Sequence, residues 1–254
     1  MMLTVRSILF NALFYGWTTI MATVCAITLA LPLRIAIRAQ EVWSDGVIWL
    51  LAHIADIGLE IRGGENLPDG AAVVAAKHLS AWDTVVFHTL LNKPAIVLKK
   101  ELLSLPLFGP FCRKVGMIPL DRAGRAGALR ALLRKAREAA DAGRPILIFP
   151  EGTRARPGEH LPLSPGVAGL YRHLGLPVVP VALNSGLFWP RQTFRRYPGT
   201  IVVEYLPAIA PGLGRDAFMA RLETAIQGGT DALIAEAHAA GQGLPMAPLQ
   251  SSCL

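Results

Sequence analysis

A histidine and an aspartate stand where a predicted buried strand gives way to a predicted helix. The apolar run 71–76 leads into Lys77 and His78, and Asp83 follows five residues after His78, just before a helical stretch that begins at Thr84. Residues five apart on one regular helix point about 140° away from each other, so His78 and Asp83 meet only if the turn folds back. A helix that begins at Asp83 permits this contact. An aspartate on one ring nitrogen fixes the tautomer and stabilises the imidazolium formed when the other nitrogen takes a proton. The spacing predicts His78 as a general base and Asp83 as its orienting residue, although an aspartate at a helix start is often only a cap.

A second polar group follows the apolar stretch 146–149. It consists of Glu151, Gly152, Thr153 and Arg154. Glycine permits close backbone approach, threonine offers a hydroxyl, and arginine offers a planar fork that suits phosphate oxygens. Because ligand-binding residues collect at the carboxyl ends of sheet strands, this turn is a candidate phosphate-binding site, with an ordinary polar loop as the alternative.

A third charged group closes the segment 116–122, which reads GMIPLDR and ends in Asp121 and Arg122. It also follows a predicted strand. Four basic residues precede it and are expected to form a basic rim with it: Lys99, Lys100, Arg113 and Lys114.

The elements that must position these groups alternate between short apolar runs and helical stretches. Buried strands are predicted at 59–62, 71–76, 95–98, 117–120, 146–149, 178–183 and 200–205, and a long helix at 124–142. Such alternation predicts an α/β fold with a largely parallel or mixed sheet flanked by helices. The arginines of the 124–142 helix are interpreted as a solvated face rather than a nucleic-acid reader.

A long uncharged run, 8–33, precedes the predicted sheet, with Arg6 before it and Arg34 and Arg38 after it. As one helix it would reach about 39 Å, enough to cross a hydrocarbon core of about 30 Å with some tilt. A shallow, interfacial or hairpin insertion is the alternative, since a second helical apolar stripe follows at Val47, Leu50, Leu51, Ile54 and Ile57. A cleavable signal peptide is disfavoured because the run is too long and lacks a convincing cleavage site.

The composition is that of one apolar, basic protein. Of the 254 residues 52% are hydrophobic and 17% charged, and the mean hydropathy of +0.42 excludes disorder and favours contact with lipid. The net charge of +7 favours an anionic partner. Three dispersed cysteines indicate neither a disulfide framework nor a thiolate metal site. We expect membrane-associated helices over 1–57, a catalytic domain over 58–242 and a flexible tail over 243–254.

Four blocks in this order resemble the glycerolipid acyltransferase family, most closely its bacterial 1-acyl-sn-glycerol-3-phosphate acyltransferases. KHLSAWD resembles the family's H-x4-D block, KVGMIPLDR its second block, FPEGTR its third, and the Val179, Pro180, Val181 segment its fourth. The resemblance implies that His78 takes the proton of the acceptor hydroxyl while Asp83 orients it. It also implies that the glycerol phosphate is bound by the second and third blocks, at Arg122, Glu151, Gly152, Thr153 and Arg154. Lys77, Leu79 and Ala155 depart from the family's usual asparagine, glutamine and serine, which bears on turn geometry and headgroup choice.

The residues and the resemblance together predict transfer of a fatty acyl group from an acyl thioester to the sn-2 hydroxyl of lysophosphatidic acid, giving phosphatidic acid. No cofactor or metal is expected, and the donor is acyl carrier protein or coenzyme A, with Arg191, Arg195 and Arg196 as candidate docking residues. Backbone N–H groups after His78 are candidate oxyanion donors. The expected location is the bacterial cytoplasmic membrane, with the active domain facing the cytoplasm and membrane lipid, not nucleic acid, as partner.

Rival interpretations differ in substrate or in class. Ser164 lacks a G-x-S-x-G setting, because Pro162 replaces the first glycine, which argues against a serine hydrolase. An acyltransferase of another lyso-lipid, such as a lyso-ornithine lipid, would not need phosphate-binding arginines. A non-enzymatic membrane-anchored adaptor would leave FPEGTR unexplained.

Overall fold

The computed structural model describes residues 1–121 and 125–244, and a seven-stranded sheet forms its centre. The strands are β1 (Ile57–Arg62), β2 (Val73–Ala76), β3 (Ala95–Lys99), β4 (Ile118–Leu120), β5 (Ile146–Ile148), β6 (Val178–Leu183) and β7 (Gly199–Tyr205). Each coincides with a predicted strand to within two residues at either end. They lie in the order β1-β7-β6-β2-β5-β3-β4, so the strand that precedes His78 is the central one.

The sheet is mixed, as predicted. The pairs β2–β5, β2–β6, β3–β5 and β3–β4 are parallel, whereas β7 is antiparallel to β6 and parallel to β1. One edge therefore collects the carboxyl ends of β2 to β6 together with the amino ends of β1 and β7. The polar residues that follow the predicted strands are brought to this edge.

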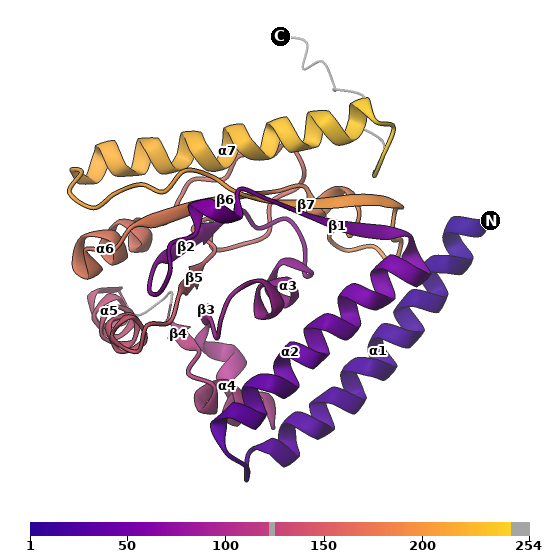
Figure 1. Ribbon diagram of the computed structural model, residues 1–254, viewed down its shortest axis with the longest axis horizontal. Helices are drawn as coiled ribbons and strands as arrows, with labels where there is room; N and C mark the ends of the chain where they lie inside the picture. The colour runs from indigo at the N-terminus through magenta and orange to yellow at the C-terminus, as the bar shows by residue number, and fades with distance from the viewer. Residues whose placement is uncertain (122–124, 245–254) are drawn as a thin grey trace.

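Helices cover both faces of the sheet (Figure 1). They are α1 (Met2–Thr28), α2 (Leu33–Leu50), α3 (Asp83–Leu90), α4 (Phe108–Lys114), α5 (Arg125–Asp141), α6 (Pro165–Leu174) and α7 (Arg215–Ala239). The long α7 lies over β6 and β7 on one side, and the α1–α2 pair and α3 lie on the other. The α/β architecture flanked by helices is thus confirmed.

Alternation along β2 separates two hydrophobic cores. Val73 and Ala75 pack into the core beneath α5, α6 and the first half of α7. Val74 and Ala76 pack into the core beneath α2 and α3. Successive side chains of a strand point to opposite faces, so every residue of β2 is buried in one core or the other.

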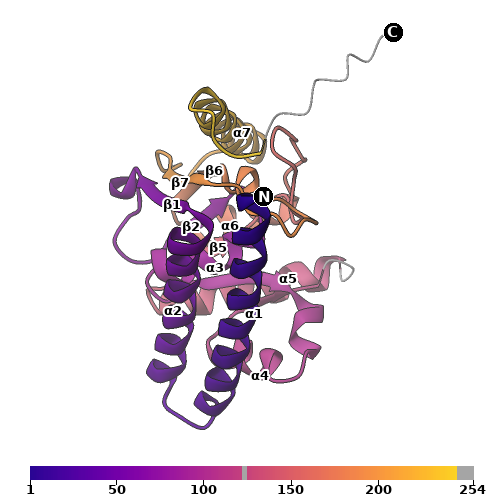
Figure 2. The same ribbon diagram turned by 90° about the vertical axis from the view of Figure 1, so that its right-hand side faces the viewer.

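The first two helices form a hairpin in which α1 and α2 lie side by side (Figures 1 and 2). The indole N–H of Trp17 donates to the carbonyl of Trp43 at 3.0 Å, which links the two helices. The uncharged run 8–33 is therefore not one helix: α1 ends at Thr28, and Pro32 precedes α2 in an extended conformation that breaks the helix. The prediction that Ile57 continues a helical stripe is wrong, because the chain turns at Asp56 with a φ of 61° and enters β1.

Both ends of α1 are attached to the rest of the protein. Near its start, Arg6 forms an ion pair of 2.9 Å with Asp56, immediately before β1. At its end, Lys114 of α4 donates 2.8 Å hydrogen bonds to the carbonyls of Thr28 and Leu29, where the negative end of the helix dipole favours a cation. The helix thus lies along the α/β domain rather than projecting from it.

Candidate active site

His78 and Asp83 are in contact at the carboxyl end of the central strand. His78 Nδ1 lies 3.0 Å from Asp83 Oδ2, and Asp83 is the first residue of α3, so the chain folds back as the spacing required. The carboxylate is fully buried, while the side chain of His78 is 13% exposed. With Nδ1 held by a carboxylate, Nε2 is the ring nitrogen able to accept a proton from a substrate. The geometry suits a general base, and the catalytic role itself stays a prediction.

Asp83 is held by three further donors. The backbone N–H groups of Leu79 and Ser80 donate to its Oδ2 at 2.7 and 2.8 Å, and the hydroxyl of Ser185 donates to its Oδ1 at 2.5 Å. The backbone N–H groups of Leu79 and Ser80 are therefore engaged by the carboxylate. The expectation that the N–H groups directly after His78 stabilise an oxyanion is wrong for these two.

Ser185 is a site residue that the sequence analysis missed. It lies two residues beyond β6, is fully buried, and reaches Asp83 from a separate strand. A signal existed in the sequence, since a polar Asn-Ser pair follows the buried strand as polar residues follow β2 and β5. The neighbouring Asn184 serves a structural purpose, because its side-chain oxygen accepts from the backbone N–H of Val202 at 2.8 Å.

The turn after β5 lies against His78. The ring of Phe149 stacks on the imidazole with centroids 4.3 Å apart, and the backbone N–H of Ala155 donates to the carbonyl of His78 at 2.8 Å. Gly152 adopts a φ of +71°, a conformation that glycine takes without strain. The structure thus brings the first and third sequence blocks together, as the parallel arrangement of β2 and β5 requires.

Arg154 lies in this turn, directly before the residue that binds the carbonyl of His78. It is half-buried, and Thr153 beside it is exposed. Arg191, from the loop between β6 and β7, donates from Nη1 to the backbone carbonyl of Arg154 at 3.2 Å. The backbone of Arg154 thus lies next to His78 in the fold, and its guanidinium is a candidate ligand for an acceptor phosphate.

Glu151 occupies a different environment from Arg154. Its side chain is fully buried and forms a 2.6 Å ion pair with Lys77, whose side chain is also buried. In this position the carboxylate contacts Lys77 inside the protein, which does not match the expectation of a direct substrate contact. The sequence did contain a signal for this ion pair. Lys77 directly follows a buried apolar strand, and a charged side chain that is buried needs a partner of opposite charge.

Arg122, expected to bind phosphate, lies outside the described residues. The preceding Asp121 pairs with Lys100 at 2.5 Å. The expected basic rim is wrong in part, since Lys114 binds the end of α1 and Arg113 donates to the carbonyl of Leu103. Both belong to α4, which packs against the hairpin.

The three arginines of the β6–β7 loop separate into two kinds. Arg191 and Arg195 are exposed, but Arg196 is 4% exposed. Its guanidinium lies over the rings of Trp189 and Phe10, and burial lowers its pKa to about 10. The proposed role of Arg196 in docking a donor is therefore wrong: this side chain attaches the loop to α1.

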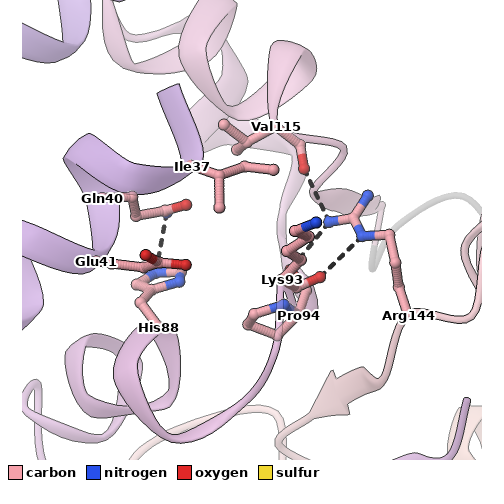
Figure 3. A pocket seen from close by; sticks show the side chains of 8 residues that line it. All are labelled: Ile37, Gln40, Glu41, His88, Lys93, Pro94, Val115 and Arg144. Atoms are coloured by element: carbon pink, nitrogen blue, oxygen red, sulfur yellow. Dashed lines mark hydrogen bonds between the residues drawn. The ribbon is translucent and has the colours of Figure 1, made fainter. Parts of the chain in front are cut away.

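A small cavity lies between α2, the end of α3 and Arg144 (Figure 3). Its volume of about 10 Å³ admits about one water molecule. Gln40 and His88 contact each other at 3.1 Å on one side, and on the other Arg144 donates to the carbonyls of Lys93 and Val115. The cavity is a feature of the α2–α3 contact and is separate from the His78 site.

Comparisons with known proteins show the family to which the chain belongs. A family model described as Acyltransferase matches residues 58–184. The chain is 36% identical over 210 residues to a 1-acyl-sn-glycerol-3-phosphate acyltransferase of Pseudomonas aeruginosa, covering 81% of this chain and 80% of that protein. It is 28% identical to the alpha form of the enzyme of that name from Mus musculus, over 79% of this chain and 72% of that one.

The fold matches a solved structure as well. The crystal structure of the 1-acyl-sn-glycerophosphate acyltransferase PlsC from Thermotoga maritima superposes with a TM-score of 0.76 at 22% identity, covering 92% of this chain and 98% of that one. The fold and site define an acyltransferase. The chain belongs to the Acyltransferase family, and the relatives named above are 1-acyl-sn-glycerol-3-phosphate acyltransferases.

Proposed function

We propose that this protein acylates the sn-2 hydroxyl of 1-acyl-sn-glycerol-3-phosphate and so forms phosphatidic acid. The observation that carries the proposal is the contact between His78 and the turn after β5, which contains Arg154. Asp83 orients the imidazole, and the Ala155 N–H on the His78 carbonyl sets a phosphate-binding arginine beside it. This acceptor requires a base for its hydroxyl, which His78 supplies, and a cation that binds its phosphate, which Arg154 supplies. The relatives that carry this activity in their names support the same assignment.

The reaction follows from the roles of these residues. Nε2 of His78 takes the proton from the acceptor hydroxyl as its oxygen attacks the carbonyl carbon of an acyl thioester. The C–O bond forms, the C–S bond breaks, and the imidazolium returns the proton to the departing thiolate. Asp83 stabilises the imidazolium between these steps. The acyl donor is a thioester of acyl carrier protein or coenzyme A, and Arg191 and Arg195 are the exposed candidates for contact with either anionic donor.

We further propose that the protein is attached to the bacterial cytoplasmic membrane, with the catalytic site on the cytoplasmic side. Among the described residues α1 is the one helix whose length and composition suffice to cross a membrane, and most of it is exposed. Because both of its ends bind the α/β domain, a crossing would carry one end of that domain through the bilayer. Interfacial insertion of the hairpin is therefore favoured over spanning.

The test is an assay of the purified full-length protein in detergent micelles. Lysophosphatidic acid and lyso-ornithine lipid are each offered with acyl-coenzyme A and with acyl carrier protein thioester, and the acylated lipid is quantified. Formation of phosphatidic acid that is lost in His78→Ala supports the proposal. Acylation of lyso-ornithine lipid alone would reject the acceptor, and no acylation of either lipid would reject the reaction.

A further inference from the structure

Lys77 is a buried cation on the opposite face of the sheet from His78. The alternation of β2 continues through the two residues, so His78 packs on Phe149 while Lys77 reaches the side covered by α7. Its side chain is 1% exposed. Burying an ammonium group costs free energy unless its three N–H groups donate hydrogen bonds. The acceptors of these bonds therefore show which segments Lys77 holds in place.

Three acceptors surround the ammonium group. Lys77 Nζ donates to Glu151 Oε1 at 2.6 Å, to Gln227 Oε1 at 2.7 Å and to the backbone carbonyl of Glu159 at 3.0 Å. These acceptors come from the turn after β5, from α7 and from the loop that follows the turn. One side chain therefore joins three segments to the end of the central strand.

The turn that bears Arg154 is consequently fixed at two points. The carboxylate of Glu151 binds Lys77, and the N–H of Ala155 binds the carbonyl of His78 at 2.8 Å. Arg154 stands between these attachments. Both attachments end on the two adjacent residues that directly follow β2, so the position of Arg154 relative to His78 depends on both.

We propose that the Lys77–Glu151 pair is a positioning device that sets Arg154 relative to His78, and that neither residue of the pair touches the substrate. The inference rests on the proposed function, because it concerns how that site holds its acceptor. The contact it positions is made to the phosphate, which does not change during acyl transfer. Loss of the pair is therefore expected to raise KM for the acceptor and to leave kcat nearly unchanged, as for any contact equally strong in the ground and transition states.

Two variants separate positioning from stability. Glu151→Asp keeps both charges but shortens the link by one methylene, so the turn shifts while the ion pair is retained. The double variant Lys77→Met, Glu151→Met removes both charges at similar volume, which avoids the unpaired buried charge that either single change would leave. The matched control is Arg62→Met, Glu236→Met, which deletes another ion pair between the sheet and α7, at β1.

The measurements are the melting temperature by circular dichroism and the acceptor dependence of phosphatidic acid formation in micelles. We expect Glu151→Asp to melt near the wild-type temperature with KM for lysophosphatidic acid raised at least about fivefold and kcat within about threefold. The Met,Met variant should show a larger rise in KM, and the Arg62, Glu236 control none. Wild-type KM in folded Glu151→Asp, or equal losses of kcat in both variants, would overturn the inference while the wild-type activity upholds the proposed function. Lack of phosphatidic acid formation by the wild type would overturn both.

Discussion

The hydroxyl of Ser185 donates a 2.5 Å hydrogen bond to Asp83 Oδ1, the carboxylate oxygen that does not face His78. The bond joins the segment that follows β6 to the start of α3, which follows the neighbouring central strand β2. It restricts rotation of the carboxylate whose other oxygen contacts His78. Asp83 is thus oriented from two sides, by Ser185 and by the backbone of Leu79 and Ser80.

Ser185→Ala is expected to reduce kcat while the protein stays folded. A hydrogen bond to a charged group contributes about 1.5–3 kcal/mol, which corresponds to a fall in kcat of about 10- to 150-fold. Because two backbone donors still hold Asp83 in the variant, we expect a fall near the lower value, about 10-fold. The rate is measured at saturating acceptor and donor. Ser164→Ala, which removes the N-cap of α6, is the control and should lower the melting temperature without lowering kcat. A wild-type kcat in Ser185→Ala would remove Ser185 from the site.

Replacement of His78 or Asp83, the proposed catalytic pair, should have the largest effect. His78→Ala is expected to lower kcat by about 10²–10⁴-fold because the general base is lost, and Asp83→Asn should remove most of the activity because the tautomer is no longer fixed. His160→Ala is a matched control, since His160 forms a 2.9 Å pair with Asp231 on the surface. More than about a tenth of the wild-type rate in folded His78→Ala, judged by circular dichroism, would contradict the assignment.

Arg154 should act on the acceptor rather than on the donor. Arg154→Ala is expected to lower kcat/KM for lysophosphatidic acid by about 10- to 150-fold, and Arg154→Lys by less, because lysine keeps the charge but loses the bidentate fork. Arg122→Ala is expected to behave in the same way. The donor's KM should change little. The exposed Arg221 of α7 supplies the control alanine variant, and unchanged acceptor kinetics in both Arg154→Ala and Arg122→Ala would favour an acceptor without phosphate.

The sequence predicted the strands and the His78–Asp83 contact because both depend on short-range patterns. Apolar runs mark buried strands, and a helix beginning at Asp83 needs only local geometry. The partners of Asp83 and Glu151 come from residues far along the chain, at Ser185 and Lys77, and depend on which strands lie side by side. Strand order is set by the whole packing, so these contacts were visible only as unexplained polar residues at strand ends.

For the N-terminal hairpin, too, the sequence predicted the local structure but not the long-range contacts. Composition predicted an apolar helix near the N-terminus, but it could not distinguish spanning from interfacial insertion. The distinction rests on Arg6 and Lys114, which attach the two ends of α1 to the α/β domain through contacts 50 and 86 residues apart in the sequence.

Interfacial insertion predicts that both ends of α1 are reached from the same side of the membrane. Single cysteines are placed at Met2 and at Leu31, both exposed, in a protein whose native cysteines are replaced by serine. In inverted membrane vesicles a membrane-impermeant maleimide should label both positions, because the proposed arrangement places both ends on the cytoplasmic side. The protein should also stay with the vesicles in high salt, which screens purely electrostatic attachment. Labelling of only one position before detergent is added would favour a spanning helix.

His88 is expected to make stability depend on pH. Its ring is buried at the end of α3 between Gln40 and Trp43, and burial lowers its pKa to about 4 from an ordinary value of 6.5. Glu41, Lys93 and Arg144 are the charged residues that line the same cavity (Figure 3). Between pH 6.5 and 4 the unfolded chain binds a proton at this histidine that the folded protein does not. The free energy of unfolding therefore falls as the pH decreases through this window.

The loss attributable to His88 is on the order of 3 kcal/mol between pH 7 and pH 4. His88→Gln preserves a polar side chain facing Gln40 but cannot take up the proton. Its melting temperature should therefore decrease less steeply with falling pH than that of the wild type, measured by circular dichroism in micelles at pH 7, 6, 5 and 4. His53→Gln, at a histidine stacked on Trp49 at the exposed surface of the hairpin, is the control and should keep the wild-type slope. Parallel pH profiles for wild type and His88→Gln would show that protonation of His88 does not govern the acid stability of the α2–α3 contact.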